Sequence, residues 1–182
     1  MRTFALVALS AAWTAALGWA SLQDIRSRKI RNSTLFLVFF LSAAGTMLQI
    51  RHQFSIMMPG LSESQGPIGS AFGSMILAVL VSHLLSALLL SVPMLAVDVK
   101  KPGSFGGADI KLGFAGAFML PFKDGLEAFY VSFLLAAVLV IWWKYRKRQE
   151  KTDLPASSFP LAPCLSVGML YGLIRMLTLI LT

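Results

Sequence analysis

Two carboxylates, Asp24 and Asp109, are the side chains of this chain best placed to do chemistry. Asp24 lies just beyond an apolar run that ends at Leu22, and Asp109 stands at the start of another. An ionisable residue at the edge of a membrane segment is costly to keep there, which makes it a functional candidate. Two carboxylates in a low-dielectric site do not both ionise readily, so one keeps its proton. The charged one can then act as a general base and the protonated one as a general acid, activating a water and protonating a leaving amine.

A purely structural interpretation stays open beside this one. Each carboxylate has a basic residue close in sequence, Arg26 for Asp24 and Lys111 for Asp109, with which it could form an interfacial ion pair. Asp98 is expected on the same side, but in a polar loop where a solvated role is favoured.

Metal and cofactor chemistry are not expected. Cys164 is the only cysteine, so an intramolecular disulfide and a cysteine-paired zinc site are excluded. The two histidines, His52 and His83, lie far apart in sequence, which disfavours a histidine-rich metal centre. An acid pair needs neither a metal nor a nucleophilic side chain.

The composition indicates an integral membrane protein formed by one domain over residues 1–182. Hydrophobic residues make up 57% of the chain and charged residues 13%, against about 25% charged in soluble domains. The net charge of +8 would favour nucleic-acid binding in a soluble protein. Here the basic residues gather in short loops between apolar runs, which is typical of membrane topology, so no nucleic acid is expected as a partner.

Six apolar segments predict an all-α bundle of six transmembrane helices. The first is long enough to span and is followed by a basic cluster, so we prefer an uncleaved helix to a secretory signal. The segments cover about 3–22, 33–50, 68–97, 108–121, 126–143 and 159–181.

The fourth segment is short for a transmembrane helix. At about 1.5 Å per residue it reaches roughly 22 Å, less than the roughly 30 Å hydrocarbon core, so an interfacial or re-entrant piece is the alternative. Its small residues suit close helix contact rather than exposure to lipid: Gly113, Ala115, Gly116 and Ala117.

Loop charges predict the orientation. Twelve of the 16 basic residues fall in the first, third and fifth loops, which are therefore expected in the cytoplasm, with both termini outside. The basic start of the fifth loop is interpreted as an anchor on anionic lipid. The first segment then leaves the membrane at Asp24 and the fourth enters it at Asp109, so both carboxylates are expected at the cytoplasmic leaflet of the inner membrane.

Three local motifs resemble those of the type IV prepilin peptidases, in the family's order. The run from Asp24 to Asn32 resembles the first aspartate motif, and the run from Gly106 to Leu112 resembles the second, Gly-x-Gly-Asp-x-Lys. Phe159-Pro-Leu-Ala-Pro163, followed by Gly168, resembles the late Pro-x-x-Pro segment. The similarity covers essentially the whole chain. Arg31 and Ala108 depart from the family's proline and second glycine.

The resemblance implies a membrane-embedded aspartic endopeptidase of the Gly-x-Gly-Asp type. Such enzymes remove the short basic leader from pilin-like precursors at the cytoplasmic face. By carry-over, Asp24 and Asp109 are the catalytic pair. Gly106 and Gly107 would shape the approach to the scissile peptide, and Lys111 could tune a carboxylate or contact a lipid phosphate.

The short first loop sets the expected subtype. It holds about ten residues and no cysteine, whereas longer members carry an N-methyltransferase insert there. The chain is therefore similar to the peptidases of tight-adherence (Flp) pilus systems, and methylation is not expected. Two other classes remain as alternatives: a small proton- or ion-coupled carrier, and an inactive assembly component of a pilus or secretion system. The oligomeric state is not predicted.

Overall fold

The computed structural model describes residues 2–27, 29–61, 68–102, 104–150 and 161–181. These residues form helices joined by short connections, and no strand occurs among them. The helices are α1 (Arg2–Ser27), α2 (Asn32–Leu61), α3 (Ile68–Lys100), α4 (Gly107–Ala117), α5 (Phe122–Glu150) and α6 (Ala162–Leu181). The prediction of an all-α protein is confirmed for the described residues.

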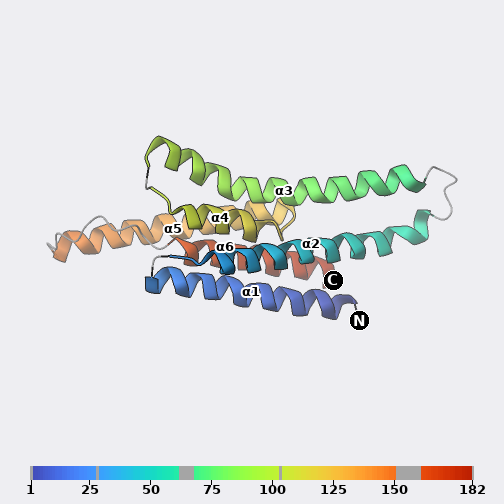
Figure 1. The fold of residues 1–182 in the computed structure, drawn as a ribbon, viewed down its shortest axis with the longest axis horizontal. Helices are drawn as coiled ribbons and strands as arrows, with labels where there is room; N and C mark the ends of the chain where they lie inside the picture. Colours follow the sequence, from blue (N-terminus) through green and yellow to red (C-terminus); the bar gives the residue numbers. More distant parts are fainter. Residues whose placement is uncertain (1, 28, 62–67, 103, 151–160, 182) are drawn as a thin grey trace.

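Five of these helices are long and apolar enough to cross a membrane, and α4 is not among them. With 11 residues, α4 reaches about 16 Å, roughly half of the hydrocarbon thickness. It packs against α2, α3 and α6, and Figure 1 shows it inside the bundle, alongside the longer helices. The fold is thus an all-α membrane bundle in which five long helices accompany one short inner helix.

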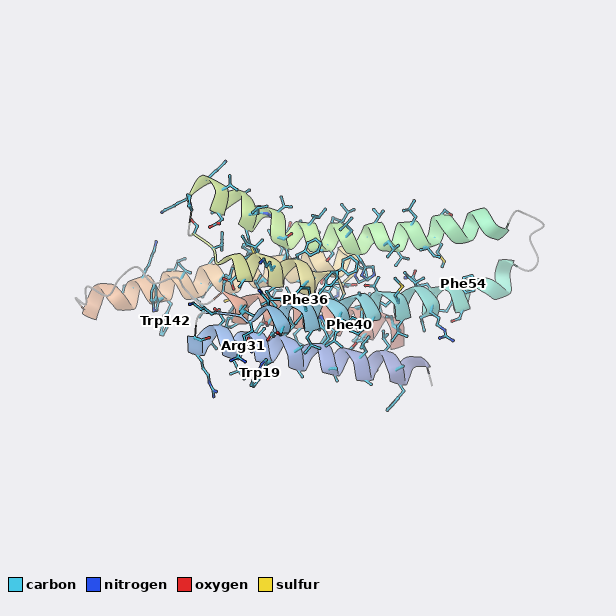
Figure 2. All side chains as sticks on the ribbon, viewed as in Figure 1. Trp19, Arg31, Phe36, Phe40, Phe54 and Trp142 are labelled. Atoms are coloured by element: carbon cyan, nitrogen blue, oxygen red, sulfur yellow. The ribbon has the colours of Figure 1, made fainter. Side chains whose placement is uncertain are left out.

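Large apolar side chains point outward from the bundle, as a lipid environment requires. Trp19, Phe36 and Phe40 are 57%, 74% and 72% exposed, and Figure 2 shows them on the outside of α1 and α2. In water such a surface would drive association. In a bilayer it is the ordinary contact surface with acyl chains.

The helix ends divide the bundle into two poles. The chain termini lie at one pole, where α2 ends and α3 begins (Figure 1). The α1–α2 connection, the start of α4 and the start of α6 lie at the other. We name this second pole the carboxylate pole, because it holds Asp24 in the last turn of α1 and Asp109 in the first turn of α4.

Most helices run further than the apolar segments predict. Helix α1 continues to Ser27, so Asp24 lies within its last turn rather than beyond it, and α2 continues to Leu61, into the stretch expected to be a loop. Hydropathy marks where the apolar run stops, whereas residues such as Gln and Arg continue a helix readily. The start of the sixth predicted segment, 159–160, lies outside the described residues.

Small residues allow the inner helices to pack closely, as expected for α4. A Cβ added at Gly116 would lie 2.4 Å from the Met169 sulfur of α6. Between α5 and α6, a Cβ at Gly168 would lie 1.9 Å from the Ser132 hydroxyl. At Gly168 the added Cβ would also lie 2.5 Å from the Ala128 backbone carbonyl, so glycine there allows α5 and α6 to approach closely, whereas at Gly116 the Met169 side chain would have to move.

Polar side chains hold the C-terminal end of α4. Thr46 donates to the Phe118 carbonyl at 3.0 Å, and the Nδ1 of His83 lies 2.9 Å from the same oxygen. The Gln49 amide donates to the Met119 carbonyl at 3.0 Å. Helix C-termini leave carbonyls without intrahelical partners. Side chains from α2 and α3 supply partners here, and His83 makes an interhelical contact.

Candidate active site

Asp24 is buried where α1 meets the start of α6. Its side chain is 7% exposed, and its Oδ2 accepts a hydrogen bond from the Ala162 backbone N–H at 3.3 Å. Ala162 is the first residue of α6. The N-terminus of a helix carries free N–H groups and partial positive charge, so it favours a negatively charged partner. This contact stabilises the ionised form of Asp24.

The sequence around Ala162 explains why α6 begins there. Pro163 is the second residue of the helix, where its missing N–H leaves no intrahelical bond unmade. The Leu165 N–H donates to the Leu161 carbonyl at 3.1 Å and closes the first turn. The Pro-x-x-Pro motif was the signal for this contact, but sequence reasoning assigned it no role. The first two residues of the run Phe159–Pro163 lie outside the described residues.

Asp109 is buried in the first turn of α4, with 8% of its side chain exposed. Among the described residues, none forms a hydrogen bond with its Oδ1. Burial, and to a smaller extent the nearby Asp24 carboxylate, raise the pKa of Asp109 to about 7, against an opposing hydrogen bond from the Gly106 backbone. Asp109 lies outside the five candidate spans. The structure therefore brings Asp24 and Asp109 close enough to affect each other's charge.

The two glycines before Asp109 have different surroundings. Gly106 precedes α4 in an extended conformation, and a Cβ added to it would lie 3.0 Å from the Asp109 Oδ2. A Cβ added to Gly107 would meet no atom within 4 Å among the described residues. A side chain at position 106 would therefore press on the Asp109 carboxylate, whereas one at position 107 would not.

Asp98 holds the connection that leads into α4. It lies within α3, not in a polar loop as expected, and its Oδ1 accepts the Phe105 N–H at 3.2 Å. This bond fixes the chain just before Gly106. Asp98 therefore has a structural contact with the segment that carries Asp109.

The basic residues near the pair remain at the surface. Arg26 and Lys111 are exposed, whereas both carboxylates are buried. The charge that shifts the pKa of Asp109 comes from Asp24. The interpretation of Asp109 as half of an interfacial ion pair with Lys111 therefore loses support, and Lys111 stays a candidate for contact with lipid or substrate.

The two carboxylates differ in the protonation state that their surroundings favour, as acid–base chemistry needs. Asp24 accepts a backbone N–H, which favours its charged form, and Asp109 is held in a site that favours its protonated form. Within the described ranges, no group of three or more His, Cys, Asp or Glu side chains could hold a metal ion. The arrangement can take a proton from water on one side and give one to a leaving group on the other.

A comparison with protein families identifies the chain. The model of the type IV leader peptidase family matches residues 11–141, a stretch that includes Asp24 and Asp109. No curated protein and no solved structure matches the chain significantly. Because the family match covers well over half of the sequence, the chain belongs to the type IV leader peptidase family.

Proposed function

We propose that this protein is an aspartic endopeptidase of the cytoplasmic membrane that removes the basic leader from pilin-like precursors. Membership of the type IV leader peptidase family supports a peptidase. The observation that carries the proposal is the buried pair of Asp24 and Asp109, brought together from the end of α1 and the start of α4. Two coupled carboxylates of unequal proton affinity are the machinery of aspartic proteolysis.

In the proposed mechanism Asp24 is the base and Asp109 the acid. Asp24 takes a proton from a water molecule as the water oxygen attacks the scissile carbonyl carbon. Asp109 then gives its proton to the amide nitrogen as the carbon–nitrogen bond breaks. The products are a carboxylic acid and an amine, and the pair is left with its proton on Asp24. Transfer of that proton back to Asp109 restores the starting state.

The carboxylate pole is proposed to face the cytoplasm. Exposed basic residues gather there, and they are sparser at the opposite pole, as the positive-inside rule requires of a cytoplasmic side. Those at the carboxylate pole are Arg26, Lys29, Arg31, Lys100, Lys101 and Lys144. A leader that emerges on the cytoplasmic side of the membrane would then reach the acid pair without crossing the bilayer.

Cleavage by the purified protein tests the proposed function against the alternatives. The protein in detergent, without an ion gradient, is mixed with a pilin-like precursor of the tight-adherence type, and the product is measured by mass spectrometry. A peptidase yields the precursor shortened at its leader, with no methyl group added to the new N-terminus. A carrier or an inactive assembly component leaves a panel of such precursors intact.

Alanine at Gly106 is expected to slow cleavage, whereas alanine at Gly107 is not. A Cβ at Gly106 lies 3.0 Å from the Asp109 Oδ2, so the carboxyl group must shift by a few tenths of an ångström. Because misplacing a catalytic group by about 1 Å costs on the order of 10²-fold, we expect kcat/KM of Gly106→Ala to fall several-fold to about tenfold. Gly107→Ala is the matched control, and equal rates for the two variants would contradict this account of Gly106.

Cleavage is expected to depend on pH through Asp109. Its pKa is raised to about 7, so the carboxyl group is protonated below that pH and loses its proton above it. A general acid works only while it is protonated, so kcat/KM should be highest below pH 7 and fall about tenfold per pH unit well above it. The measurement is kcat/KM against pH in detergent. A rate that stays level from neutral into alkaline pH would show that Asp109 is not the acid.

A further inference from the structure

A cavity lies at the pole opposite the carboxylate pair, between α2, the start of α5 and the end of α6. Its volume is about 170 Å³. Gln49, His52 and Gln53 line it from α2, Asp124 lines it from the first turn of α5, and Met176 and Leu179 line it from α6. The cavity thus combines polar groups on one side with an apolar wall on the other. It has no part in the proposed cleavage.

Asp124 is a buried carboxylate with an unused oxygen. It is 4% exposed, and no described residue forms a hydrogen bond with its Oδ1. Arg175 and Lys123 lie near enough to act on the Asp124 charge, but the Arg175 guanidinium donates its hydrogen bonds to the two oxygens of Glu127. A buried carboxylate is costly unless donors surround it, so a ligand in the cavity that brings N–H donors to this group would stabilise it.

We propose that this cavity binds a primary ammonium group that carries an alkyl portion. The ammonium N–H groups would donate to the Asp124 carboxylate, which lines the cavity, and the alkyl portion would lie against Met176 and Leu179. Such a group supplies a positive charge and N–H donors to the carboxylate. A quaternary ammonium has the charge but no N–H, so the cavity should discriminate between the two.

The position of the cavity favours an ethanolamine phospholipid as the source of the ammonium group. The three helices that line it reach the ends of their candidate spans here, at Ile56 for α2, Phe122 for α5 and Ile180 for α6. These ends mark the level of lipid headgroups. Arg51 and Lys123, each next in sequence to a lining residue, are exposed and could meet the phosphate of the same headgroup. A free amine from solution is the second source.

Lipid retention by the full-length purified protein tests the proposal. Native mass spectrometry compares bound phosphatidylethanolamine with bound phosphatidylcholine of identical acyl chains. We expect retention of the ethanolamine lipid to be at least about tenfold higher, as the loss of a charge-assisted hydrogen bond implies. In Asp124→Asn this preference should disappear. Asp98→Asn, which removes a charge at the other pole, is the matched control and should keep it.

A second arm separates the two sources. Ethanolamine is titrated into protein freed of phospholipid, and the thermal unfolding midpoint is followed. Asp124-dependent preference for the ethanolamine lipid supports a lipid ligand, whereas Asp124-dependent stabilisation by ethanolamine alone supports a soluble amine. No preference in the wild type, or a preference that persists in Asp124→Asn, would overturn the proposal. Gln53→Leu, at an exposed lining position, gives a second variant should Asp124→Asn fail to fold.

Discussion

Asparagine in place of either Asp24 or Asp109 is expected to abolish cleavage of a pilin-like precursor while the protein still inserts. Asparagine keeps the shape of the side chain but can neither accept nor give the proton that the mechanism moves. Removing one proton-transfer catalyst costs about 10²- to 10⁴-fold. Because the two carboxylates work as a unit, loss of either should cost far more. Co-expression with the precursor, scored by its size shift, measures the effect.

The double variant gives this prediction a sharper form. If the carboxylates act as one unit, Asp24→Asn combined with Asp109→Asn should be no slower than the worse single variant. Asp98→Asn is the control from the same pole, because the asparagine oxygen can still accept the Phe105 N–H. Near-normal cleavage by either single variant would refute the assignment of the pair.

Proline at Ala162 is expected to lower kcat/KM by about tenfold or more. The change removes the Ala162 N–H that donates to the Asp24 Oδ2, and α6 should survive it because proline is well tolerated at the first position of a helix. A hydrogen bond to a charged group contributes about 1.5–3 kcal/mol, and about 1.4 kcal/mol is a factor of ten. The rate is measured on purified protein in detergent.

Ala162→Gly is the matched control for the proline variant. Glycine perturbs the same helix start but keeps the N–H, so its rate should stay within a few-fold of the wild type. If both variants lose activity equally, the position matters for packing rather than for the hydrogen bond. If neither loses activity, the α6 N-terminus does not support Asp24.

The meeting of the two carboxylates could be predicted because it depends on topology. Alternation of apolar segments sends the end of the first and the start of the fourth to the same face, and burial of both acids follows from their place beside apolar runs. The small residues of α4 were a second useful signal, since Gly113, Ala115, Gly116 and Ala117 are all buried in the bundle. The order of the apolar segments and the size of the residues were sufficient for these points.

Contacts between distant residues could not be predicted in the same way. Asp24 and Ala162 are separated by 138 positions, and no local pattern states which helix start will meet which carboxylate. The ion pair of Arg175 with Glu127 likewise joins two helices, across 48 positions of sequence. The cavity beside Asp124 also depends on three helices together. Each of these features arises from tertiary packing, to which a single sequence gives no direct access.

The anchored C-terminal end of α4 has a consequence for the depth of Asp109. Thr46, His83 and Gln49 tie the carbonyls of Phe118 and Met119 to α2 and α3. With that end fixed, the distance of Asp109 from it is set by the number of helical residues between them, at about 1.5 Å and 100° each. The length of α4 therefore sets how far Asp109 lies from the fixed end and in which direction around the helix it points.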